Sequence, residues 1–296
     1  MGIDALKRAF IGRAVGWLRV YNQNYDMAVF VNDHIGGAII TYGQYEKQYL
    51  EMTRQVLIEL TGNESFKDGT CLDIGANIGN HALFYSTIFK QVIAFEPNPI
   101  AYKLLEANIL KNRIANIRIC TTALGSKKEK KVLSICHENL GMSSLVQETK
   151  TAHPSFNLEI EINVGDDLIE EMVDDQSGIS FIKLDVEGFE AEALKGLRKT
   201  ISKYRPIISI ELNFASLNKP SEAALNVLAD LGYKNFYVLE RPHSFRNRYL
   251  NFMSRVILGE KLVLSKLDKF EPVDYQQIFC VANPVATPNQ NKVRHQ

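Results

Sequence analysis

The chain has 296 residues, of which 46% are hydrophobic and 23% are charged, so it is long enough to bury a sizeable core as one large or two modest globular domains. Lysine plus arginine equals aspartate plus glutamate at 34 each, and this absence of net charge gives no support for a nucleic-acid partner. No apolar run approaches the roughly 20 residues that span a bilayer. Scattered cysteines without a Cys-x-x-Cys pair favour buried thiols in a reducing compartment, which predicts a cytoplasmic protein.

The first predicted element is a basic amphipathic helix over residues 4–22, in which Lys7, Arg8, Arg13 and Arg19 alternate with apolar side chains. Two interpretations stay open. The helix could make a peripheral contact with an anionic membrane that carries a lipid-linked substrate. Alternatively, it packs on the domain or on a partner subunit of a homo-oligomer, and the glycines of this segment favour that second interpretation.

Two further elements complete an N-terminal extension that we assign to residues 1–65. Residues 27–31 and 38–41 are short apolar stretches on either side of Gly36 and Gly37, which predicts a small hairpin. Between Tyr45 and Leu60 the apolar residues follow helical spacing, which predicts a helix.

A glycine turn follows the first strand of the main domain, which we place at residues 66–285. Residues 70–81 read Thr-Cys-Leu-Asp-Ile-Gly-Ala-Asn-Ile-Gly-Asn-His, a buried strand that breaks into a turn where Gly75 and Gly79 let a ligand approach the backbone. A dinucleotide fingerprint would have Gly-x-Gly-x-x-Gly here, so that a pyrophosphate rests on the helix N-terminus. Asp73 would repel a pyrophosphate but could help to hold an ammonium group. The pattern therefore favours a cationic amino-acid nucleoside, S-adenosylmethionine, over NAD.

The next strand, residues 91–95, ends in Glu-Pro-Asn-Pro, which places Glu96 where a second-strand carboxylate can accept both ribose hydroxyls. Further along the chain are Lys-Leu-Asp-Val-Glu-Gly-Phe-Glu at 183–190 and Ile-Glu-Leu-Asn at 210–213. With these motifs in this order, the chain resembles the class I methyltransferases, and specifically the FkbM family, over residues 40–215.

The resemblance implies O-methylation of a hydroxyl on a sugar, glycan, polyketide or related metabolite, with S-adenosylmethionine as the methyl donor. It also implies that Tyr45 and Glu46 edge the cofactor pocket; alternatively, Glu46 is an acid at a helix N-terminus that interacts with the helix macrodipole. The chain has no Asn-Pro-Pro-Tyr after the fourth strand, which argues against adenine methylation, and no Pro-Cys that would offer a nucleophile for cytosine methylation. Two other classes stay open: a non-catalytic nucleoside-binding protein and, least favoured, an NAD-type oxidoreductase.

The remaining elements predict an α/β fold, a Rossmann-like doubly wound sheet of roughly seven strands with the last strand antiparallel. Helices are expected at 100–111, 165–172, 189–204 and 221–231, and strands at 116–125, 179–184, 206–213, 233–240 and 278–282. A charged turn at 127–131 begins a β insertion after the third strand, with short strands at 132–135, 143–146 and 158–164. Within it, residues 139–145 are either a hairpin turn or a substrate-facing loop.

The segment 241–277 is long for one connection between strands. The apolar residues between 249 and 264 have helical spacing, so this insertion either caps the acceptor pocket or forms a surface helical pair. Residues 286–296 are rich in polar residues and predict a flexible tail.

Open α/β sheets bind ligands at the carboxyl ends of their strands, and the candidate site residues lie at those ends. The predicted cofactor-binding residues are Asp73, Gly75, Asn77, Gly79, Asn80, Glu96, Pro97, Asn98, Ala123 and Leu124. The catalytic candidates are Asp185, Glu187, Glu211 and His81. Asp185 or Glu187 is preferred as the base that takes the proton of the acceptor hydroxyl, and His81 also has a structural interpretation. Alternatively, Asp185, Glu211 and Asn213 hold Mg²⁺, which would orient the acceptor.

Overall fold

The structure is a computed structural model that describes residues 25–31, 33–136, 145, 155–173, 177–213, 219–240, 262–271 and 273–282, together with Lys7, Phe10 and Arg13. Most of the basic segment 4–22 and of the loop 139–145 falls outside these residues. The same is true of the insertion up to residue 261 and of the tail 286–296. What the sequence predicts for these segments stays a prediction.

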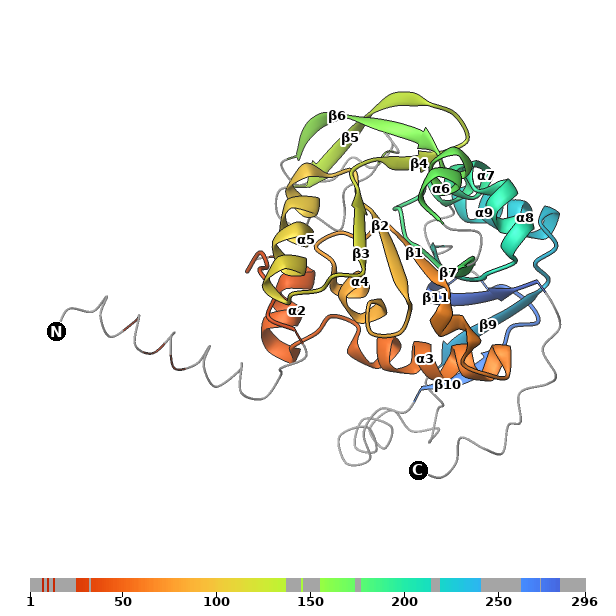
Figure 1. Ribbon diagram of the computed structural model, residues 1–296, viewed down its shortest axis with the longest axis horizontal. Coiled ribbons are helices and arrows are strands. Elements are labelled where there is room, and N and C mark those ends of the chain that lie inside the picture. Colours follow the sequence, from red (N-terminus) through yellow and green to blue (C-terminus); the bar gives the residue numbers. More distant parts are fainter. Residues whose placement is uncertain are drawn as a thin grey trace.

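The main sheet has eight strands in the order β10-β9-β11-β8-β7-β1-β2-β3 (Figure 1). Its strands are β1 Thr70–Ile74, β2 Gln91–Phe95, β3 Ile117–Cys120, β7 Ile179–Leu184, β8 Ile207–Asn213, β9 Asn235–Glu240, β10 Val263–Lys266 and β11 Asp274–Val281. The run from β3 through β2, β1 and β7 to β8 is parallel, whereas β11 is antiparallel to β8 and β9. The predicted Rossmann-like doubly wound fold is thereby confirmed. Because β1 pairs with both β2 and β7, the strand order reverses there, which is where such sheets bind ligands.

Helices cover both faces of this sheet (Figure 1). They are α2 His34–Tyr42, α3 Lys47–Thr61, α4 Asn80–Tyr85, α5 Pro99–Lys111, α6 Gly165–Met172, α7 Glu190–Gly196, α8 Arg198–Tyr204 and α9 Lys219–Asp230, with a 3-10 turn at Ser65–Asp68. Alternate residues of a strand supply opposite cores: Leu72 and Ile74 pack with the α6–α9 side, and Cys71 packs with the α3–α5 side. Within the described residues, no helix has both the length and the apolar composition needed to cross a membrane.

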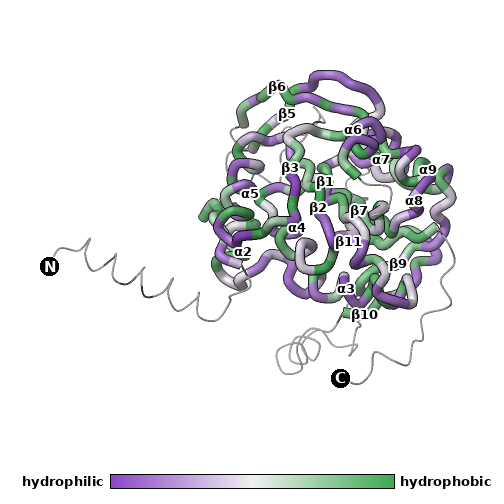
Figure 2. Tube along the Cα trace, viewed as in Figure 1, coloured by the Kyte–Doolittle hydropathy of each residue, from purple (hydrophilic) through white to green (hydrophobic). Residues whose placement is uncertain are grey.

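A second, three-stranded sheet lies over one edge of the main sheet, in the order β4-β6-β5. Its strands are β4 Ala123–Gly125, β5 Glu129–Cys136 and β6 Ser155–Val164. Hydrophobic and hydrophilic residues alternate along β6 (Figure 2), and in β5 the buried Leu133 and Ile135 alternate with less buried neighbours, as expected of strands with one buried face. The predicted β insertion is confirmed. The predicted third strand, however, divides into β3 and β4, which belong to different sheets, and β5 already begins inside the predicted charged turn.

The predicted N-terminal hairpin is wrong, because residues 38–41 belong to helix α2. Asp33 begins this helix, with its Oδ1 accepting a hydrogen bond from Ile35 N at 3.2 Å. A side chain on Gly36 would place its Cβ 1.8 Å from the carbonyl oxygen of Phe30, so the glycine lets the helix pack closely on the preceding segment. Capping and packing thus override the strand preference of the β-branched residues.

Two other sequence predictions need correction. The helix expected at 189–204 is two helices, and Leu197 lies between them with helical geometry lost. Gly196 packs against β4 so closely that a Cβ would lie 2.0 Å from the carbonyl oxygen of Gly125. This close contact lies directly before the break between the two helices at Leu197. The helical spacing expected to reach residue 264 is also wrong at its end, because β10 begins at Val263.

Candidate active site

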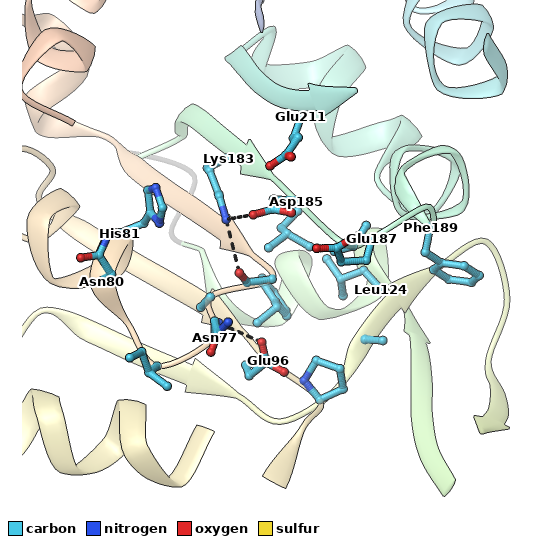
Figure 3. A pocket seen from close by; sticks show the side chains of 18 of the residues that line it. Asn77, Asn80, His81, Glu96, Leu124, Lys183, Asp185, Glu187, Phe189 and Glu211 are labelled. Atoms are coloured by element: carbon cyan, nitrogen blue, oxygen red, sulfur yellow. Dashed lines mark hydrogen bonds and ion pairs between the residues drawn. The ribbon is translucent and has the colours of Figure 1, made fainter. Parts of the chain in front are cut away.

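A pocket opens at the carboxyl ends of β1, β2, β7 and β8 (Figure 3). Among its lining residues are most of those predicted from the sequence: Gly75, Asn77, Asn80, His81, Glu96, Pro97, Ala123, Leu124, Asp185, Glu187 and Glu211. Asp73, Gly79 and Asn98 do not line it and lie beneath its walls. The structure therefore brings these strand ends together in one pocket, and the roles of the individual residues stay predictions.

Residues 75–79, which we call the donor turn, owe their glycines to packing within the protein. Gly75 and Gly79 have φ values of +84° and +93°, which favour glycine. A Cβ on Gly75 would lie 1.8 Å from the carbonyl oxygen of Asp185, and one on Gly79 would lie 2.4 Å from Leu105 Cδ1. The glycines therefore let β1 end against the end of β7 and let α4 begin against α5. This differs from the sequence interpretation, in which they cleared space for a ligand.

Glu96 follows β2, and its carboxylate is held by the donor turn. Oε2 accepts a hydrogen bond from Asn77 N and Oε1 accepts one from Asn98 N, both at 2.8 Å. Asn98 in turn begins α5, with its Oδ1 accepting from Ile100 N at 3.0 Å. Burial raises the pKa of Glu96 to about 7, although the two backbone N–H groups act in the opposite direction. Each oxygen retains capacity to accept a further hydrogen bond from a ligand.

Asp73 and Lys183 form a buried ion pair under the pocket. Asp73 is fully buried, and its Oδ1 lies 3.8 Å from Lys183 Nζ. Burial raises the pKa of Asp73, and the positive charge of Lys183 opposes that rise. Lys183 Nζ also donates to Asp185 Oδ2 at 3.0 Å and to the carbonyl oxygen of Gly75 at 3.3 Å. Lys183 belongs to the motif at residues 183–190 but is not among the site residues predicted from the sequence.

Three carboxylic acids line the acceptor side of the pocket, and we call them the acceptor acids. Asp185 and Glu187 follow β7, and Glu211 lies near the end of β8. Burial and the negative charges of Asp185 and Glu190 raise the pKa of Glu187 to about 7. Burial and the charges of Asp185, Glu46 and Glu187 raise the pKa of Glu211 as well. Water reaches Glu187 and Glu211 in the open pocket and screens part of this repulsion, so excluding that water would strengthen both shifts.

The turn that carries the acceptor acids is shaped by its own backbone. Glu187 has a φ of +50°, which is uncommon for a residue with a side chain, and Gly188 follows at +95°. Glu190 Oε1 accepts a hydrogen bond from Gly188 N at 3.0 Å, so this acid stabilises the turn. A positive φ at a residue with a side chain costs conformational free energy, and such residues cluster at functional sites.

A loop before α3 closes the other side of the pocket. The Asn80 amide donates to the carbonyl oxygen of Tyr45 at 2.9 Å and accepts from Tyr45 N at 3.1 Å. His81 Nε2 lies 3.1 Å from Glu46 Oε2, and Glu46 has a φ of +53°. Asn80 is predicted to bind the cofactor, but its side-chain amide forms hydrogen bonds with the backbone of this loop at Tyr45.

Comparison with known proteins identifies the family of this chain. The family described as the methyltransferase FkbM domain matches residues 73–234, from the end of β1 past the acceptor acids. The chain belongs to the FkbM methyltransferase family.

Relatives of this FkbM chain include Methyltransferase 1 of Beauveria bassiana, which is 27% identical over an alignment of 147 residues; the match covers 44% of this chain and 59% of that protein. Hexuronic acid methyltransferase AglP of Haloferax volcanii is 28% identical over 154 residues, 52% of this chain and 60% of that protein. This chain also matches the crystal structure of methyltransferase FkbM from Methylobacillus flagellatus, with a TM-score of 0.42 and 17% sequence identity. The match covers 93% of this chain and 60% of that chain. The matches thus span 59% to 60% of the length of these relatives.

The predicted magnesium site gains no support. In the part of the FkbM chain that the structure describes, no three or more His, Cys, Asp or Glu side chains are grouped in a way that could hold a metal ion. Asp185 is instead paired with Lys183 at 3.0 Å, which places an ammonium group where a metal would compete for the carboxylate. The side chain of Asn213, the third predicted ligand, lies outside the described part.

Proposed function

We propose that this FkbM chain transfers a methyl group from S-adenosylmethionine to a hydroxyl of a sugar-containing, polyketide or related small metabolite. The observation that carries the proposal is one pocket that contains both the Glu96 carboxylate at the end of β2 and the acceptor acids at the ends of β7 and β8. A nucleoside site and a proton-accepting group are the two components that methyl transfer to oxygen requires.

The donor half of the pocket suits an amino-acid nucleoside. Glu96 would accept hydrogen bonds from the ribose hydroxyls, since the donor turn holds its carboxylate in place. Asn77 Oδ1 is buried, and no described protein atom donates a hydrogen bond to it; the ammonium group of the methionine portion would satisfy it. Ala123 and Leu124 provide an apolar wall for the adenine ring. When bound, S-adenosylmethionine supplies a methyl group on a sulfonium, which is already an activated leaving group.

In the acceptor half, Glu187 is the preferred base. A general base works best when its pKa lies near the operating pH, and the pKa of Glu187 is raised to about 7. The acceptor hydroxyl gives its proton to the Glu187 carboxylate, and the hydroxyl oxygen forms a bond to the methyl carbon as the carbon–sulfur bond breaks. The products are a methyl ether, a protonated Glu187 and neutral S-adenosylhomocysteine.

A relative supports the choice of a sugar acceptor. Hexuronic acid methyltransferase AglP, by its name, acts on a sugar acid, and it aligns with 52% of this chain. Within the proposal, a sugar or glycan hydroxyl is therefore the first acceptor class to examine, followed by polyketides.

Calorimetry with S-adenosylmethionine and S-adenosylhomocysteine tests the donor site, and transfer of a tritiated methyl group to pools of sugars, glycans and polyketides tests the reaction. Glu187→Gln should abolish most transfer while S-adenosylhomocysteine binds as in the wild type. Glu170→Gln, a substitution of an exposed acid on α6, is the matched control. Absence of binding to either nucleoside would refute the proposal, and transfer at the wild-type rate by Glu187→Gln would remove Glu187 as the base.

A further inference from the structure

Lys183 is a buried cation that contacts both halves of the pocket (Figure 3). It lies on β7 directly beside Asp73 of β1 in the sheet register, and it is 7% exposed. Its Nζ donates to the carbonyl oxygen of Gly75, the first residue of the donor turn, and to Oδ2 of Asp185, the first acceptor acid, at 3.3 Å and 3.0 Å. One ammonium group therefore joins the two segments that form the pocket floor.

Packing alone does not explain a lysine at this position. Residue 181, two positions earlier on the same strand face, is a fully buried phenylalanine stacked on Phe89, so the face is apolar up to the strand end. Burial disfavours a charged lysine, but the negative charges of Asp185 and Asp73 outweigh it and raise the pKa of Lys183. Replacing a whole buried ion pair by apolar residues is often neutral or stabilising, whereas removing the lysine alone would leave Asp73 as an uncompensated buried charge. Stability alone therefore does not explain why the pair of Asp73 and Lys183 is present at this position.

We infer that Lys183 is a positioning residue for methyl transfer: its ammonium group fixes the donor turn and the acceptor acids relative to each other, through the Gly75 carbonyl and the Asp185 carboxylate. This inference rests on the proposed function. It adds a residue that would act through Asp185 and the backbone of the donor turn, the two groups to which its Nζ donates.

The contact matters because in-line transfer depends on alignment of the two reactants. A displacement of about 1 Å can cost on the order of 100-fold in rate. The two segments already meet through Asp185 N, which donates to the carbonyl oxygen of Ile74 at 3.1 Å. That bond fixes the backbone of Asp185, and Lys183 is the group that fixes its carboxylate.

Lys183 also sets the charge of the pocket. Among the described residues, the acids and the histidine around Lys183 are Asp73 on β1, Glu96 after β2, Asp185 and Glu187 after β7, Glu211 on β8, Glu46 before α3 and His81 on α4. The charge of Lys183 opposes the rise that burial produces in the pKa of Glu187 and of Glu211, so removing the cation should let these two acids hold their protons up to a higher pH. The same change should favour a cationic sulfonium over a neutral thioether.

The test compares Lys183→Met and Lys183→Arg with the wild type, using S-adenosylmethionine and S-adenosylhomocysteine as binding probes and the best acceptor from the tritium screen. In Lys183→Met we expect kcat to fall on the order of 100-fold. The acid limb of the pH–rate profile should move to higher pH, and affinity should shift toward S-adenosylmethionine relative to S-adenosylhomocysteine. Lys183→Arg keeps the charge, so its acid limb should stay at the wild-type pH even where its rate is lower.

Lys183→Met leaves Asp73 buried without its cation, so a second variant guards against misfolding. The double variant Asp73→Asn with Lys183→Met removes both charges of the buried pair. Asp185 still loses the hydrogen bond from Lys183 Nζ in this variant. Lys195→Met, which removes an exposed lysine paired with Glu192, is the matched control. Thermal melting and S-adenosylhomocysteine affinity report whether each variant is folded.

The outcomes separate the two proposals. Absence of donor binding or of methyl transfer in the wild type would refute the proposed function itself. If the wild type is active, a folded Lys183→Met variant, alone or with Asp73→Asn, that keeps the wild-type kcat, acid limb and ratio of donor to product affinity would overturn the role of Lys183.

Discussion

Replacing Glu96 by glutamine should weaken S-adenosylhomocysteine binding by about 1.5–3 kcal/mol, the usual contribution of hydrogen bonds to a charged group, which is roughly 10- to 150-fold in Kd. The structure indicates why an amide cannot substitute. The carboxylate accepts from both Asn77 N and Asn98 N at 2.8 Å, whereas a glutamine NH₂ group cannot accept either of them. The substitution therefore removes the charge and also disturbs the donor turn. Calorimetry at pH 8, with thermal melting to confirm folding, measures the effect.

The binding reaction should also depend on pH with a sign that follows from burial. The pKa of Glu96 is raised to about 7 in the free protein, and hydroxyl donors favour its ionised form. Below about pH 7 the acid must release a proton on binding, so affinity should fall by up to about tenfold per pH unit, and above that pH it should level off. Glu96→Gln should lose this dependence, and Glu106→Gln, on the exposed face of α5, should keep it. A folded Glu96→Gln variant with the wild-type Kd at pH 8 would refute the reasoning.

Three further predictions follow from the same geometry. Glu187→Gln should lower kcat by about 10²- to 10⁴-fold, the range of general-base catalysis, with S-adenosylhomocysteine affinity unchanged; equal losses in both would indicate a structural role. Gly75→Ala should lower the free energy of unfolding by about 1–3 kcal/mol or more in urea, since its Cβ would lie 1.8 Å from the Asp185 carbonyl oxygen; Gly62→Ala, at a φ of +75° but with nothing within 4 Å, should cost less. Among matched sugars, one that carries a carboxylate should compete more weakly than its uncharged counterpart, because the described acceptor half is lined by acids; tighter binding of the sugar acid would contradict this.

The central strands could be predicted from the sequence because their local and tertiary signals agree. The five residues of β1 are all buried, and the glycines that follow end the strand where the pattern indicates. Helix α2 was missed because its β-branched residues and paired glycines match a hairpin locally, whereas its formation depends on Asp33 and on packing against Phe30. Strand β10 was missed for the same reason: its pairing with β9 is a non-local contact that helical spacing does not reveal.

The candidate site was predictable to the extent that strand ends determine it. Residues after β1, β2 and β7 meet because parallel strands end at one edge, and the sequence carries that information in its motifs. Contacts between side chains on different elements could not be predicted in this way, because the motifs do not give the distances between elements. Lys183 reads as part of an apolar strand until the structure places it beside Asp73 and Asp185, and the amide of Asn80 reads as a ligand contact until Tyr45 is found to occupy it.

The reason for Gly75 links these observations to function. A glycine cleared for a ligand would tolerate movement between β1 and β7, because only the ligand would fill the space. Here the space is filled by the Asp185 carbonyl group, and Asp185 N donates back to the carbonyl oxygen of Ile74, so the backbone at the start of the donor turn is held directly against the backbone of Asp185. Within the proposal, alignment of donor and acceptor then depends on this backbone contact together with Lys183, and not on which acceptor is bound. Specificity for the acceptor must arise from side chains and segments around that edge, which can vary without disturbing the geometry of transfer.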